Sequence, residues 1–123
     1  MAILQLDNLT KRFGNFTAVE HVSLTVADGE MVALLGESGC GKTTTLRMIA
    51  GFSEADEGVI TIDGKVMNSI PAYKRNVGIF FQNYALFPHL TAYDNIAFGL
   101  KVQKRDRHEI REKVGKIIHM VKL

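Results

Sequence analysis

The chain has 123 residues, of which 46% are hydrophobic and 8% aromatic, a composition typical of a globular protein with one core. No stretch approaches the roughly 18 uninterrupted apolar residues of a membrane-spanning helix, and the first residues lack the pattern of a secretion signal. We therefore expect a cytoplasmic chain. The single cysteine, Cys40, agrees with a reducing compartment because it has no partner for a disulfide or a zinc site.

The net charge of +2 conceals an uneven distribution. Eight of the 15 Lys and Arg residues lie in residues 101–123, which hold only three of the 13 Asp and Glu residues. A basic tail can indicate nucleic-acid binding. The same segment also spaces four apolar residues as one stripe of a helix: Ile110, Val114, Ile117 and Val121. This stripe leaves the charges on a solvated face, so we expect no nucleic-acid partner.

The first part of the chain predicts short antiparallel strands. Residues 3–6 and 22–26 have the spacing of strands, and in the second of them apolar and polar residues alternate. The Asp-Gly pair at residues 28–29 predicts a turn directly afterwards. Residues 58–67 predict a hairpin that turns at a second Asp-Gly pair, residues 63–64.

Two further segments predict core strands. Residues 31–35 (MVALL) and 77–81 (VGIFF) are continuously apolar, the pattern of strands that are covered on both faces of a parallel sheet. The first leads into a glycine-rich segment, and the second ends at Gln82.

Helices are predicted in two places. Residues 42–50 have a helical pattern that ends at Gly51, the usual position of glycine after a helix. From Tyr93 onward the pattern is helical again, apart from a break near residues 103–106.

The glycine-rich segment at residues 36–43 matches G-x-x-x-x-G-K-[ST] between a predicted strand and a helix. Glycine allows consecutive backbone N–H groups to curve around a phosphate, and the first turn of the helix adds unpaired donors and partial positive charge. Lys42 adds a full charge toward the β- and γ-phosphates, and the Thr43 hydroxyl is placed to ligate Mg²⁺. The segment predicts a site for a nucleoside triphosphate with Mg²⁺.

The residues on both sides of this motif resemble one family. VSLTVADGEMVALLGESGCGKTTTLRMIAG, followed by GIFFQNYALFPHLTAYDNIAFGL, resembles the nucleotide-binding subunits of ATP-binding-cassette (ABC) transporters, especially bacterial importers of sugars, polyamines, iron or other small solutes. The resemblance runs over essentially the whole chain and covers only the first part of that family's domain. It implies an α/β fold, in which residues 1–123 form a P-loop NTPase core of ABC type with an N-terminal antiparallel β subdomain, truncated before the signature motif and the Walker B strand.

The resemblance also implies which residues bind ATP. Phe13 would stack on the adenine with Ala18 beside it, although a phenylalanine in such a pattern is by itself more often a core residue. The phosphates would be bound by the Walker A loop and the start of the helix: Gly36, Ser38, Gly39, Cys40, Gly41, Lys42, Thr43 and Thr44.

Gln82 matches the glutamine of the family's Q-loop. Its amide oxygen would reach Mg²⁺ and the attacking water, since an amide carries an acceptor and donors on one short stem. The resemblance thus implies that Lys42 and Gln82 serve catalysis and that Thr43 and Gln82 are the metal ligands.

Apolar and aromatic side chains are concentrated after Gln82. Such a concentration is either a small core cluster or a groove for another protein. By resemblance, a groove near Tyr84, Phe87 and Leu90 would accept a short coupling helix of a transmembrane subunit. The family also pairs two ATPase subunits, and the protein would be peripheral on the inner face of the cell membrane.

The implied function is ATP binding and hydrolysis that power solute import. The family's signature motif, Walker B aspartate and catalytic glutamate have no counterpart in the 123 residues, so we expect this chain to bind ATP without hydrolysing it. Two alternatives are a stand-alone nucleotide-binding or interaction module and a soluble ABC ATPase outside transport. The sequence of residues 81–96 favours a transport subunit over a soluble ABC ATPase outside transport.

Overall fold

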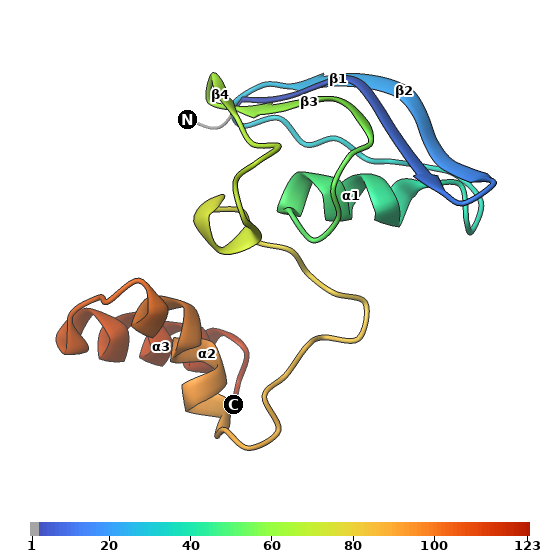
Figure 1. Cartoon of the computed structure of the whole chain (residues 1–123). Helices are drawn as coiled ribbons and strands as arrows, with labels where there is room; N and C mark the ends of the chain where they lie inside the picture. The colour runs from blue at the N-terminus through green and yellow to red at the C-terminus, as the bar shows by residue number, and fades with distance from the viewer. Residues whose placement is uncertain (1–2) are drawn as a thin grey trace. The chain divides into compact units, whose positions relative to one another are not determined.

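The computed structural model describes residues 3–123, and the chain forms two compact units, residues 1–79 and residues 80–123 (Figure 1). Each unit has its own buried apolar cluster. No helix among the described residues is both long and apolar enough to cross a bilayer.

The first unit is built on a four-stranded antiparallel sheet with the strand order β2-β1-β3-β4. The strands are β1 (Leu4–Phe13), β2 (Phe16–Val26), β3 (Glu57–Ile62) and β4 (Lys65–Val66). The first two are longer than the sequence indicates, because their pairing continues to a tip where Phe13 lies opposite Phe16. The hairpin predicted at residues 63–64 is confirmed as the turn between β3 and β4, and residues 28–29 form the expected turn after β2.

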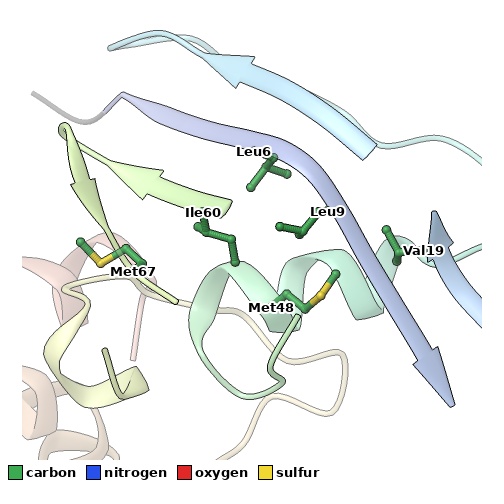
Figure 2. Close-up of a cluster of buried hydrophobic side chains, with 6 residues drawn as sticks. All are labelled: Leu6, Leu9, Val19, Met48, Ile60 and Met67. Carbon is green, nitrogen blue, oxygen red and sulfur yellow. The ribbon is translucent and has the colours of Figure 1, made fainter. Parts of the chain in front are cut away.

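A helix covers one face of this sheet (Figure 1). It is α1 (Lys42–Ala50), with the predicted bounds, and Gly51 follows it with a φ of 87°, which suits glycine. Figure 2 shows the cluster that joins helix and sheet, contributed mainly by β1, β3 and α1: Leu6, Leu9, Val19, Met48, Ile60 and Met67. Leu9 and Met48 are fully buried, so this contact fixes the helix against the sheet.

The prediction of core strands at residues 31–35 and 77–81 is wrong for this structure. Neither segment forms a strand, and Met31, Leu35 and Phe80 are 93%, 92% and 100% exposed. A parallel strand needs a neighbouring strand that supplies hydrogen bonds. Among the described residues every paired strand is antiparallel, and none pairs with these two segments.

The second unit is a pair of helices. These are α2 (Ala92–Val102) and α3 (Arg107–Met120), and they confirm both the predicted helical pattern and its break near residues 103–106. Ala97, Ile110 and Val114 form the buried contact between them. The predicted apolar stripe is only half covered, since Ile117 in α3 is 41% exposed and Val121, directly after α3, is 55% exposed. A short 3₁₀ turn, η1 (Ala72–Lys74), precedes this unit in the chain.

Candidate nucleotide-binding site

The phosphate-binding candidates gather where the glycine-rich loop enters α1. Gly41 is the residue directly before the helix and has a φ of 93°. A Cβ atom added to Gly41 would lie 2.2 Å from the carbonyl oxygen of Ala18. Only glycine satisfies both the left-handed backbone and this close approach to β2. The structure thus places Ala18 directly against the loop.

The first turn of α1 has the features of an anion site. No side chain caps this end of the helix, and its first turn contains no acidic residue. The leading N–H groups of a helix have no partner within the helix, and they carry the positive end of its dipole. Thr43 is exposed and Thr44 is half-buried at this end. Backbone donors and a hydroxyl therefore lie together in a position open to a ligand.

Lys42 holds the loop in its curved form. Its Nζ donates hydrogen bonds to the carbonyl oxygen of Gly36 and, at 2.9 Å, to that of Glu37. The same Nζ lies 3.5 Å from Sγ of Cys40. The two carbonyl oxygens are uncharged, and a phosphate oxygen forms a stronger hydrogen bond with an ammonium group because it carries negative charge. The loop therefore presents its single cation in a place where a phosphate can replace neutral partners.

The small residues of the loop leave room for a phosphate beside Lys42. A Cβ atom on Gly36 would lie 2.5 Å from Cys40 Sγ and 3.8 Å from Lys42 Nζ. Ser38 and Gly39 form a turn, and Gly39 has a φ of +82° with nothing within 4 Å of an added Cβ atom. The residues present fit a phosphate group, because side chains at the two crowded glycines would fill the space between the loop and its neighbours.

Phe13 lies at the tip of the β1–β2 hairpin, on the same hairpin as Ala18. Phe13 is 52% exposed, unlike a core residue, and Lys11 Nζ lies 5.3 Å from the ring centroid. Asp56 lies 3.6 Å from Lys11 Nζ and accepts the backbone N–H of Arg12 at 2.6 Å. That backbone hydrogen bond is the main reason why the pKa of Asp56 is lowered. An exposed ring held in this way is available for stacking, and the adenine contact itself remains a prediction.

Gln82 belongs to the second unit, where it is exposed and lies outside any strand or helix. Gln82 and Thr43 belong to different units of the chain. A shared metal ion between these two residues therefore remains a prediction.

The residues expected to contact a membrane subunit lie in the loop before α2. Tyr84 is 85% exposed, whereas the Phe87 ring packs against that of Phe98 with centroids 4.5 Å apart. Leu90 is half-buried. The cluster is thus partly a small core and partly an exposed apolar surface.

Sequence reasoning missed Asn95, which shapes this loop. Its side chain accepts the backbone N–H of Phe87 at 2.9 Å and donates to the carbonyl oxygens of Phe87, Leu90 and Thr91. Thr91 in turn caps α2 by accepting the N–H of Asp94 at 3.1 Å. The Thr-x-x-Asp spacing was a detectable signal for the helix start. The contacts of Asn95 depend on how the loop folds back, and no local pattern indicates them.

Comparison with known proteins identifies a family that agrees with the geometry described above. The family model described as "ABC transporter" matches residues 19–123. The chain therefore belongs to the ABC transporter family.

Individual relatives are similar over nearly the whole chain. This chain is 53% identical to the spermidine/putrescine import ATP-binding protein PotA of Rubrobacter xylanophilus, over 98% of this chain and 32% of that protein. It is 49% identical to the sulfate/thiosulfate import ATP-binding protein CysA of Mesostigma viride over 100% of this chain and 35% of that protein. The chain thus spans about a third of the length of these curated relatives.

A solved structure supports the fold. The dimeric post-hydrolysis state of the ATP-binding cassette MJ0796, bound to ADP and Pi, is 30% identical with a TM-score of 0.83, over 98% of this chain and 57% of that chain. The expected fold class, an ABC-type cassette with an antiparallel β subdomain, is confirmed, and this chain covers the N-terminal part of the cassette.

Proposed function

We propose that the protein is an ATP-binding subunit of an ABC importer, in which ATP binding and hydrolysis drive the uptake of a small solute. One observation carries this proposal: the Lys42 ammonium lies across the curved Gly36–Gly41 loop at the uncapped start of α1. The names of the relatives, which are import ATP-binding proteins, support the direction of transport. They include proteins for polyamines and for sulfate, so we propose no particular solute.

The proposed ATP site assigns a role to each candidate residue. The backbone from Gly36 to Thr44, together with Lys42, would bind the phosphates. The adenine would stack on Phe13 beside Ala18, whose carbonyl lies against Gly41. Mg²⁺ would be held by Thr43 and Gln82, and it would neutralise charge on the phosphates.

The proposed partners follow from the family. A second copy of the ATPase subunit would complete the site, consistent with the dimeric cassette structures. Transmembrane subunits would dock near Tyr84, Phe87 and Leu90, where apolar side chains are exposed. In this arrangement the protein is cytoplasmic and peripheral on the inner face of the membrane.

The proposal is tested by the affinity of the chain for MgATP. Lys42→Ala should weaken binding by more than tenfold, because a charge-assisted hydrogen bond contributes about 2 kcal/mol. Titration calorimetry measures the affinity, and circular dichroism verifies that the variant is folded.

The matched control is Lys65→Ala, which removes an equally charged but exposed side chain from β4 of the same unit. Its affinity should equal that of the unaltered chain. Equal affinity in the Lys42→Ala variant would contradict the assignment of the loop.

A further inference from the structure

Arg75 is the only buried arginine among the described residues, and none of the roles above uses it. Its side chain is 6% exposed. Nε donates to the carbonyl oxygen of Ile70 at 2.7 Å, and Nη1 donates to those of Met48 at 2.8 Å and Ile49 at 3.1 Å. Burial lowers the pKa of the guanidinium group, which nevertheless stays protonated near neutral pH. A buried cation is therefore directed at backbone oxygens.

Two of these oxygens belong to the last turn of α1. The final carbonyl groups of a helix lack partners within the helix and carry the negative end of its dipole, so a cation there is favourable. Met48 O also accepts the N–H of Gly51, and Phe52 N–H donates to the carbonyl oxygen of Arg47. Arg75 thus completes the C-terminal cap of the helix that carries the phosphate site at its other end.

The contact is close enough to fix the position of the helix. A Cβ atom on Gly51 would lie 2.7 Å from Arg75 Nε and 2.9 Å from Cα of Ala72 in η1. The start of α1 is held in a similar way, since Gly41 lies against the carbonyl of Ala18. A nine-residue helix is about 13 Å long and behaves as a rigid rod. A change of orientation at its C-terminal end therefore changes the direction in which the N–H groups at its start point.

We propose that Arg75 is a positioning residue for the nucleotide site, which holds α1 from its C-terminal end so that Lys42, Thr43 and Thr44 are presented to the phosphates. This inference rests on the proposed function, because it concerns the same site. Arg75 itself does not touch the nucleotide. Its effect is the preorganisation of donors, on which the affinity for a phosphate depends.

The test uses Arg75→Met, which keeps most of the buried volume and removes the charge and the hydrogen bonds. We expect MgATP affinity to fall about tenfold while the chain still unfolds cooperatively. The backbone amide signals of Lys42, Thr43 and Thr44 should shift in the nuclear magnetic resonance spectrum of the nucleotide-free chain, although they lie at the opposite end of the helix. Arg75→Lys should recover part of the affinity, because a single ammonium group supplies the charge but cannot span Ile70 O and Met48 O together.

The matched control is Arg47→Met, an exposed arginine on the last turn of the same helix. Its affinity should stay within twofold of the unaltered chain. A lower melting temperature of Arg75→Met with unchanged affinity and unchanged amide signals of residues 42–44 would overturn the inference. If Arg75→Met does not fold, Arg75→Lys is compared with the unaltered chain instead, and we expect its MgATP affinity to be about threefold lower. Unchanged affinity and unchanged amide signals in Arg75→Lys would then overturn the inference. Failure of the unaltered chain to bind MgATP would instead refute the proposed function, and the inference with it.

Discussion

At the scale of single residues, the site depends on glycines that differ in what surrounds them. Gly39 and Gly41 both have positive φ values, +82° and +93°. Gly39 has open space around it, whereas Gly41 lies against Ala18 and Val19. Substitutions at these two positions therefore distinguish the cost of the backbone conformation from the cost of a steric clash.

We expect Gly41→Ala to destabilise the first unit much more than Gly39→Ala. Each substitution costs about 1 to 2 kcal/mol for a left-handed backbone, and only Gly41→Ala adds the clash with the Ala18 carbonyl. Urea denaturation followed by circular dichroism measures the difference. Equal stability of the two variants would show that the loop does not rest on β2 as described.

In the proposed function, Lys42 would act both in the free protein and in the nucleotide-bound protein. In the free chain its ammonium closes the loop by bonding to the carbonyl oxygens of Gly36 and Glu37. These bonds are to neutral groups, so a phosphate can displace them with a gain in electrostatic energy. The loop is consequently curved before a nucleotide arrives, which reduces the cost of ordering it.

At the scale of secondary-structure elements, α2 owes its start to the loop in front of it. Thr91 caps the helix, and Asn95 ties its first turn to the backbone of Phe87 and Leu90. Asp94 and Lys101 add an ion pair at 2.7 Å on the same helix. The loop proposed to meet a membrane subunit is thus fixed by polar contacts, while its apolar side chains remain partly exposed.

We expect Asn95→Ala to release this loop. Loss of the hydrogen bond to the Phe87 N–H should speed hydrogen exchange at that amide about tenfold, equivalent to about 1.4 kcal/mol. Asn83→Ala, an exposed asparagine in the same segment, is the control and should leave the exchange rate unaltered. Unchanged protection of Phe87 in Asn95→Ala would refute the anchoring role.

At the scale of the whole molecule, the chain consists of two units with separate cores. The phosphate loop, the base-stacking candidate and Arg75 lie in the first unit, and Gln82 with the docking candidates lies in the second. The structure therefore supports binding of the phosphates within one unit. Catalysis by the proposed mechanism additionally needs Gln82 and groups that the family supplies outside the sequence similar to this chain.

We accordingly expect the 123-residue chain to bind MgATP weakly and to release phosphate no faster than background. By the proposal, the loop and Phe13 would bind the phosphates and the base, whereas the family's catalytic glutamate and signature motif match no residue of this chain. A coupled phosphate assay measures the rate, and Lys42→Ala reveals any contaminating ATPase. Turnover by the unaltered chain that Lys42→Ala abolishes would overturn this expectation.

The sequence by itself determined the elements whose signals are local. Gly51 ended the helix at the predicted residue, and the Asp-Gly pair at residues 63–64 formed the predicted turn, because both depend on the conformational freedom of glycine. The helical periodicity from Tyr93 onward, with its break near residues 103–106, was likewise sufficient to predict two helices. The phosphate motif was also recognisable, since it combines glycines, a lysine and a helix start within eight consecutive residues.

Only the tertiary structure decided the features that depend on distant neighbours. The apolar runs at residues 31–35 and 77–81 indicated buried strands, but a strand forms only where another strand supplies hydrogen bonds, and among the described residues none does. Arg75 resembled any surface arginine in the sequence, yet its three acceptors come from residues 5, 26 and 27 positions away. Burial and hydrogen bonding are set by the packing of segments remote in sequence, and local composition does not record that packing.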